Sequence, residues 1–234
     1  MTLVTSLILQ RNGHMTHSLQ KYLDNFKYIA DLGIDIIFYL DKKIDIPNYI
    51  SSNVKIIPTD IENLETFDLI KSAKEVTEGQ GPSFNPKKNT LDYMIIINSK
   101  PELLYKSLAL TNDELLFWLD SGVTHIMKEP EKTLSKILLI KNLEKGLILP
   151  GCWPANDDLN NINWRFCGGF LKGERGVLED FYKQSKIAIQ EIMPKATWEV
   201  NIWAWMEKNM SFPFKWYQAD HNDTFFDFER YLIK

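Results

Sequence analysis

The sequence has few of the features that mark secreted, membrane-spanning or metal-cluster proteins. It contains two cysteines, Cys152 and Cys167, in 234 residues. Two cysteines do not make a disulfide framework, and their spacing to histidines is not that of a metal site. No run approaches the ~20 apolar residues of a membrane span. The first residues, MTLVTSLILQRNGH, lack a basic segment, so we interpret them as a β-strand rather than a signal peptide. We expect a cytoplasmic protein, with peripheral membrane contact left open.

An excess of positive charge is also missing. The net charge of −4 argues against general nucleic-acid binding, although it leaves room for one phosphorylated small molecule in a locally basic pocket. The content of 44% hydrophobic and 25% charged residues is typical of a globular protein. A length of 234 residues favours one sizeable domain over two very small ones.

The common nucleotide-binding and catalytic motifs are absent. There is no P-loop, no G-x-G-x-x-G after the first strand, no G-x-S-x-G and no H-E-x-x-H. The candidates for function are therefore polar residues at strand ends and in turns.

The order of apolar segments predicts an α/β fold with a mostly parallel sheet. Short apolar runs with β-branched residues indicate strands, and amphipathic stretches with a period of 3.6 indicate helices. We expect strands over 2–9, 34–41, 53–58, 114–120 and 146–151, an extended segment over 163–173, a short strand near the C-terminus, and helices over 18–33, about 130–143, 174–193 and 197–209. Residues 90–110 are expected to be mostly helical, with a kink or restart at Pro101. The segment 78–90 is loop-like, and we favour a plain surface connection over a mobile lid.

The stretch FWLDSGVTHI ends an apolar strand on Asp120. A carboxylate at the carboxyl end of a strand lies where α/β sheets bind ligands, and it could hold a divalent cation that neutralises a diphosphate. The alternative is ordinary Asp-Ser-Gly turn chemistry. Lys100, in NSKPELL, could meet phosphate or sugar hydroxyls, or it could be a solvated helix lysine.

Three further positions are candidates. Gly168 and Gly169 interrupt an extended segment, which indicates a bulge or a close approach of backbone to ligand. Glu199 lies near a helix start, as a dipole-favoured or a catalytic carboxylate. His221, in the polar stretch ADHND, could complete a metal site with Asp120 or could simply be exposed.

With these segments laid out, the chain resembles the HtrL/YibB-like family of bacterial glycosyltransferases. More distantly, it is similar to retaining nucleotide-sugar transferases of the glycogenin and lipopolysaccharide-galactosyltransferase type. The segments that carry the resemblance are, in order, TLVTSL, KYLDNF, IIFYLD, NSKPELL, FWLDSGVTH, CGGFLKG and EVNIW. The resemblance implies a GT-A fold, an α/β domain over 1–234 with a mostly parallel central sheet flanked by helices. Residues 1–120 would form its nucleotide-sugar-binding half and residues 121–234 its acceptor half.

The resemblance also implies roles for the candidate residues. It places donor binding at Lys100, Asp120, Ser121, Gly122, Gly168 and Gly169, catalysis at Asp120 and Glu199, and a Mn²⁺ or Mg²⁺ ion at Asp120 and His221. One departure matters, because the second Asp of the family's D-x-D motif is Gly122 here. Metal dependence is therefore open, and a water, His125 or His221 would have to supply the lost coordination. We interpret Gly122 as letting diphosphate or metal approach closely.

Our leading hypothesis is a glycosyltransferase of polysaccharide biosynthesis. It would move a sugar, a hexose by expectation, from a nucleotide-diphosphate donor to a carbohydrate or glycoconjugate acceptor. A non-catalytic nucleotide or carbohydrate binder on the same scaffold is the alternative. A nucleotidyltransferase is favoured less, because the segment after the first strand offers only Arg11 and one glycine. A structural or interaction protein would leave the polar strand-end residues unexplained.

Overall fold

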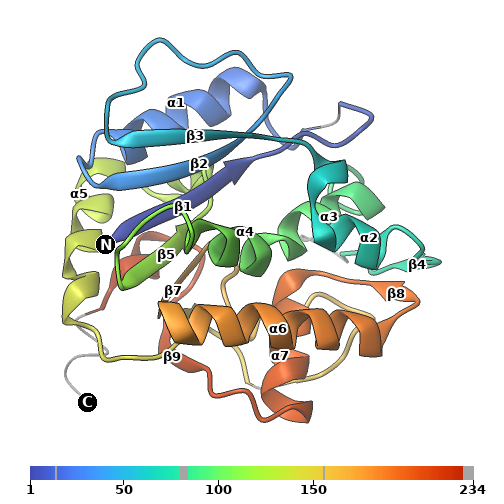
Figure 1. The fold of residues 1–234 in the computed structure, drawn as a ribbon. Coiled ribbons are helices and arrows are strands. Elements are labelled where there is room, and N and C mark those ends of the chain that lie inside the picture. Colours follow the sequence, from blue (N-terminus) through green and yellow to red (C-terminus); the bar gives the residue numbers. More distant parts are fainter. Residues whose placement is uncertain (14, 80–83, 155, 229–234) are drawn as a thin grey trace.

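The structure is a computed structural model that describes residues 1–13, 15–79, 84–154 and 156–228 (Figure 1). Its main feature is a seven-stranded sheet in the order β3-β2-β1-β5-β7-β6-β9. The strands are β1 (Thr2–Leu7), β2 (Asp35–Asp41), β3 (Val54–Thr59), β5 (Leu115–Leu119), β6 (Ile148–Gly151), β7 (Phe170–Glu174) and β9 (Lys215–Gln218). β3, β2, β1 and β5 run parallel, β7 is antiparallel to β5 and β6, and β6 is parallel to β9. A separate parallel pair joins β4 (Glu75–Val76) to β8 (Lys195–Ala196).

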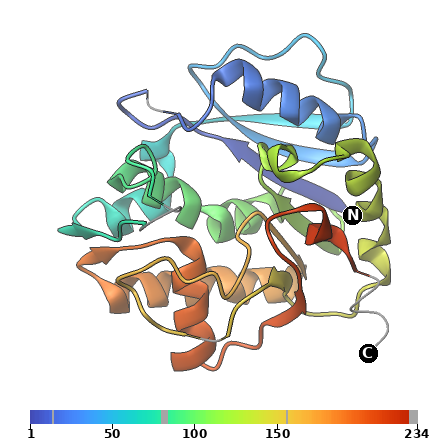
Figure 2. The same ribbon diagram turned by 180° about the vertical axis from the view of Figure 1, so that it is seen from behind.

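Helices cover both faces of this sheet (Figures 1 and 2). They are α1 (Leu19–Ala30), α2 (Glu65–Ile70), α3 (Leu91–Asn98), α4 (Lys100–Ser107), α5 (Pro130–Ser135), α6 (Arg175–Ile192) and α7 (Glu199–Asn209). α1 and α5 share one core with one face of the sheet, and α3, α4, α6 and α7 share a second core with the other face. No helix of the described residues is both long and apolar enough to cross a bilayer.

Strand β2 shows how the sequence produces this layering. Ile37 and Tyr39 belong to one core, and Phe38 and Leu40 belong to the other. Successive strand side chains point to opposite faces, so a strand covered on both faces needs a continuous apolar run. The sequence-based prediction of an α/β fold with a mostly parallel central sheet flanked by helices is confirmed.

The elements agree with the sequence-based expectations, with three differences. The helix expected at about 130–143 is α5 followed by a 3₁₀ segment over Lys136–Asn142. The extended segment expected over 163–173 forms a strand only from Phe170. The short elements α2, β4 and β8 were not predicted, because two to six residues are too few to show a hydrophobic period.

The break between α3 and α4 places one residue of the site. α3 is capped by the Thr90 hydroxyl, which accepts from Tyr93 N at 3.1 Å. The expected restart at Pro101 is confirmed, since Pro101 lies in the first turn of α4, where its missing N–H leaves no intrahelical bond unmade. Lys100 therefore stands at the corner between two helices, and it is buried.

The strand order fixes where a ligand can bind. β1 has β2 on one side and β5 on the other, so the order of the sheet reverses between β1 and β5. Open α/β sheets bind their ligands at such a switch point, beyond the carboxyl ends of the strands. Because β7 runs against β5 and pairs Phe170 with Leu119, the residues before β7 reach the same edge.

Candidate functional site

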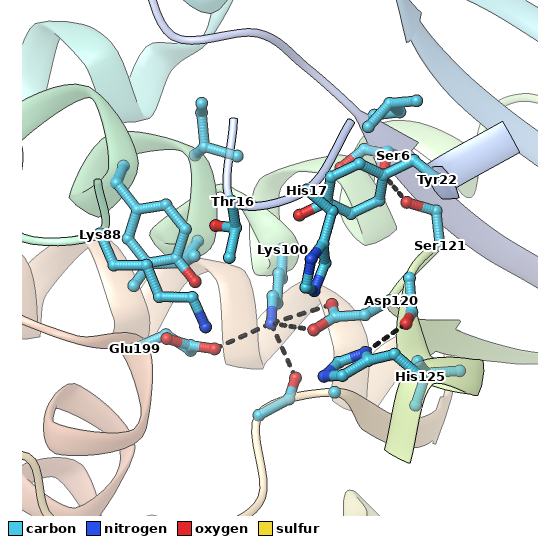
Figure 3. A pocket seen from close by; sticks show the side chains of 18 of the residues that line it. Ser6, Thr16, His17, Tyr22, Lys88, Lys100, Asp120, Ser121, His125 and Glu199 are labelled. Atoms are coloured by element: carbon cyan, nitrogen blue, oxygen red, sulfur yellow. Dashed lines mark hydrogen bonds and ion pairs between the residues drawn. The ribbon is translucent and has the colours of Figure 1, made fainter. Parts of the chain in front are cut away.

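A cavity of about 260 Å³ lies at this switch point (Figure 3). Its lining comes from segments far apart in the sequence. They include Ser6 from β1, His17 and Tyr22 from the loop and helix that follow, Lys88 from the loop before α3, Lys100 from α4, Asp120 to Gly122 after β5, Gly168 and Gly169 before β7, and Glu199 from α7.

The floor of the cavity is an ion cluster centred on Lys100 (Figure 3). The Lys100 ammonium contacts Asp120 Oδ1 at 3.0 Å and Glu199 Oε1 at 2.8 Å, and it donates to Gly168 O at 2.8 Å. Three partners use all three N–H donors of an ammonium. Burial disfavours the charged form of Lys100, but the charges of Asp120 and Glu199 outweigh it and raise the pKa of the ammonium. Lys100 therefore fixes the two carboxylates that the sequence singled out.

Asp120 follows the last residue of β5 and is held from both sides. Its N–H donates to Gly169 O at 2.9 Å, and the Trp118 indole donates to Oδ1 at 2.6 Å. Trp118 and Asp120 are two residues apart and so point to the same side of the strand. The Asp120 side chain keeps 41% of its surface exposed, whereas Lys100 and Glu199 are buried. Of the two carboxylates, Asp120 is the one open to a ligand.

Glu199 is the first residue of α7, where the helix dipole favours a carboxylate. It is 5% exposed, and its Oε2 atom is shielded from solvent without a hydrogen-bond partner among the described residues. A Cβ atom at Gly168 would lie 2.2 Å from Glu199 Oε1. A glycine is therefore needed at position 168, because a side chain there would overlap the Glu199 carboxylate. The sequence did not reveal this contact.

The Ser121-Gly122 turn has structural roles as well. The Ser121 hydroxyl donates to Ser6 O at 2.9 Å and so ties the end of β5 to the end of β1. A Cβ atom at Gly122 would lie 2.8 Å from the ring of Tyr22. The space beside Gly122 therefore holds the Tyr22 ring, which differs from the expected room for diphosphate or metal.

The side chains around Asp120 and His221 give little support to the metal site that was expected at these two residues. Both residues line the cavity, but the His221 ring packs edge-on against Trp164, with centroids 4.9 Å apart. Partial burial lowers the pKa of His221, against the opposing effect of nearby Asp220 and Asp120. Within the described residues, no group of three or more His, Cys, Asp and Glu side chains could hold a metal ion.

Sequence reasoning missed Lys88, because it lies in the segment taken for a plain surface connection. Of the described residues of that segment, Lys88 lines the cavity, whereas its neighbour Lys87 is exposed. Gln10, after β1, donates to Lys87 O at 2.9 Å and accepts from the Thr90 hydroxyl at 2.6 Å, which holds this loop against the site. The two lysines of a Gly/Pro-rich loop were the available signal.

Two histidines also line the cavity: His17, which the sequence did not single out, and His125, which it offered only as a replacement metal ligand. The rings of His17 and His125 lie 5.4 Å apart, and His125 Nδ1 contacts Gly122 O. Burial, together with the nearby charge of Lys21, lowers the pKa of His17.

The chain matches no family model and none of the curated proteins. Among solved structures it is similar to the bifunctional IspDF from Campylobacter jejuni, with 12% identity, a TM-score of 0.45, and 94% of this chain and 49% of that one covered. It is also similar to a glycosyltransferase involved in the glycosylation of the major capsid of PBCV-1, with 9% identity, a TM-score of 0.45, and 94% and 81% covered. A third is CMP:2-keto-3-deoxy-manno-octonic acid synthetase complexed with CTP, with 9% identity, a TM-score of 0.45, and 99% and 97% covered.

The chain thus spans about half the length of the IspDF protein. At these identities and TM-scores, the similarities carry no argument about activity. They do not show membership of the HtrL/YibB-like family, and that resemblance stays a prediction.

Proposed function

We propose that the protein is a glycosyltransferase that moves a sugar from a nucleotide-diphosphate donor to a carbohydrate or glycoconjugate acceptor. One observation carries the proposal. Two carboxylates from distant elements, Asp120 and Glu199, converge on one buried ammonium in a cavity at the switch point of the sheet. Perturbed and paired titratable groups in such a cavity are typical of a catalytic site.

Glu199 is suited to act on the acceptor. Its Oε1 atom is held by Lys100, while Oε2 lacks a hydrogen-bond donor among the described residues. An acceptor hydroxyl would supply that donor, and a carboxylate in hydrogen-bond reach can take the proton as the hydroxyl attacks the anomeric carbon. Because Oε2 is shielded from solvent, the substrates must uncover it when they bind. Glu199 is therefore our candidate for the general base or the acceptor-orienting group.

Asp120 is suited to the donor side, because its carboxylate is the exposed member of the cluster. The GT-A resemblance implies a nucleotide-sugar above the carboxyl ends of the parallel strands, and Asp120 lies there. The expected halves, 1–120 and 121–234, would then meet in the cavity, since Lys88 and Lys100 come from one half and Glu199 from the other. Transfer of a hexose and a role in polysaccharide biosynthesis belong to the same proposal.

The test is release of nucleoside diphosphate from a panel of UDP-, GDP- and dTDP-sugars, measured with wild-type protein and with Glu199→Gln. We expect one donor class to be turned over, slowly with water and faster with an acceptor. Glu199→Gln keeps the shape of the side chain but loses the base, so turnover should fall by about 10²–10⁴-fold while binding of the diphosphate is retained. Binding without turnover of any donor would instead favour the non-catalytic binder.

A nucleotidyltransferase is not favoured by the segment after β1. Its one arginine, Arg11, is paired with Asp92, to which Nη2 and Nε donate at 2.6 and 2.9 Å. Arg11 does not line the cavity. In this structure the charge of Arg11 is thus paired with Asp92 outside the cavity.

A further inference from the structure

Transfer from a nucleotide-sugar requires a positive charge at the departing diphosphate, and the source of that charge can be inferred from the cavity. A divalent ion is what the GT-A resemblance implies. The residues present do not fit an ion held by the protein. Lys100 lies against both oxygens of Asp120, at 3.0 and 3.3 Å, and also against Glu199. An ammonium thus occupies the place between the carboxylates that a cation would take.

The second carboxylate of the motif cannot be replaced from nearby. Gly122 stands in its position, and the Tyr22 ring fills the space beside it. Among the residues that the structure describes, no three His, Cys, Asp or Glu side chains are grouped so that they could hold a metal ion.

Binding of a diphosphate in the cavity still needs a further cation, because Lys100 is already paired with two carboxylates. Asp120 and Glu199 carry two negative charges against one positive charge, and a diphosphate would add further negative charge. The lysines that line the cavity in the described structure are Lys88 and Lys100. Since the donors of Lys100 are used, Lys88 is the cation left for the ligand.

The surroundings of the Lys88 ammonium favour binding of a diphosphate. Its ammonium lies over the rings of Tyr93 and Trp198, 5.9 and 5.7 Å from their centroids. Within the described residues it makes no ion pair and no hydrogen bond. Burial lowers the pKa of Lys88, although Glu199 and Asp120 act in the opposite direction. A desolvated ammonium without a counter-ion gains more from a phosphate oxygen than one that is already hydrated or paired.

Figure 3 shows the Lys88 ammonium directed toward the cluster of Lys100, Asp120 and Glu199. We propose that Lys88 binds the diphosphate of the donor in place of a divalent ion, so that the site works without metal. This inference rests on the proposed function.

The experiment is calorimetric titration of the whole chain with UDP, GDP, CDP and dTDP, each in EDTA and in Mn²⁺. The variants are Lys88→Met, which keeps an unbranched apolar stem, and Lys88→Arg, which keeps the charge. Lys87→Met is the matched control, since Lys87 is the exposed neighbour and does not line the cavity. The free nucleoside of the base that binds serves as a ligand without phosphate.

We expect one diphosphate to bind equally well in EDTA and in Mn²⁺. Lys88→Met should weaken that binding about tenfold or more, the worth of a hydrogen bond to a charged group, and Lys88→Arg should restore it. Lys87→Met should change the dissociation constant by no more than about twofold, since an exposed charge is screened. The nucleoside should not distinguish Lys88→Met from the wild type.

Two results would overturn the inference and leave the proposed function standing. One is binding that needs Mn²⁺ and is lost in EDTA, and the other is binding that Lys88→Met leaves unchanged. If the wild type binds no nucleotide in either buffer, the proposed function fails, and the inference fails with it.

Discussion

Gly168→Ala is the substitution that tests the geometry of the site most directly. The added Cβ would lie 2.2 Å from Glu199 Oε1 and 2.9 Å from Glu199 Cδ, distances that side chains do not adopt. The carboxylate would have to move. It is buried and paired with Lys100 at 2.8 Å, so moving it separates a buried ion pair.

The size of the effect follows from two contributions. Overpacking a well-packed site costs roughly 1–3 kcal/mol. Breaking a buried ion pair outright costs roughly 3–5 kcal/mol, but here Lys100 keeps Asp120 as a partner, so only part of that cost applies. We expect a loss of about 2–4 kcal/mol in the free energy of unfolding. For a chain of this size that corresponds to a fall in Tm of roughly 5–15 °C.

The assay is thermal and urea unfolding of Gly168→Ala beside two alanine controls. A Cβ at Gly176, in α6, meets nothing within 4 Å, so Gly176→Ala should be neutral or stabilise by up to about 1 kcal/mol. A Cβ at Gly169 would lie 3.1 Å from the Phe225 ring, which predicts a smaller loss than at Gly168. If Gly168→Ala unfolds like the wild type, Glu199 does not occupy the position described, and the argument for its role fails.

Three further results are expected. Lys100→Met leaves two carboxylates without their cation and should cost about 3–5 kcal/mol in urea unfolding. Lys132→Met, at an exposed ion pair, should unfold at nearly the same urea concentration as the wild type. The pKa of His17 in the folded chain is lowered from 6.5, so the unfolded chain binds more protons just below that pH. The free energy of unfolding should therefore fall as the pH drops through 6.5. In urea titrations, His17→Gln should remove this part of the pH dependence. The sulfur atoms of Cys152 and Cys167 lie 3.8 Å apart. Diamide, which is itself reduced to the hydrazine, should therefore oxidise the two thiols to one intramolecular disulfide. A mass spectrum without the loss of two hydrogens would contradict this.

The parts of the fold and site that the sequence predicted depend on local patterns. A strand buried on both faces must be apolar throughout. Asp120 directly follows such a strand, so this local pattern alone presents its carboxylate at the carboxyl end of β5. Glu199 at a helix start and Lys100 beside Pro101 are likewise local features. That these three side chains meet at one point depends on strand order, which the sequence indicated only through the resemblance.

The parts that the sequence did not predict depend on contacts between distant residues. Lys88 lines the cavity because Gln10, more than seventy positions earlier, holds the preceding residue and Thr90 in place. Nothing in the loop itself distinguishes an anchored lysine from a solvated one. Gly168 shows the same limit, because a glycine is needed there only on account of Glu199, which follows much later in the chain.

Gly122 shows how the two kinds of information combine. The sequence reveals that the second carboxylate of a D-x-D motif is missing, and a ligand approaching the glycine was the natural interpretation. In the structure the Tyr22 ring lies where a side chain at position 122 would begin, since a Cβ atom there would be 2.8 Å from the ring. Burial raises the pKa of Tyr22, so the ring stays a neutral phenol that cannot stand in for the missing carboxylate. The Tyr22 ring in this position therefore needs a residue without a Cβ atom at position 122. An aspartate could return to position 122 only if the ring left, and for that reason we assign the positive charge at the diphosphate to a lysine rather than to a metal.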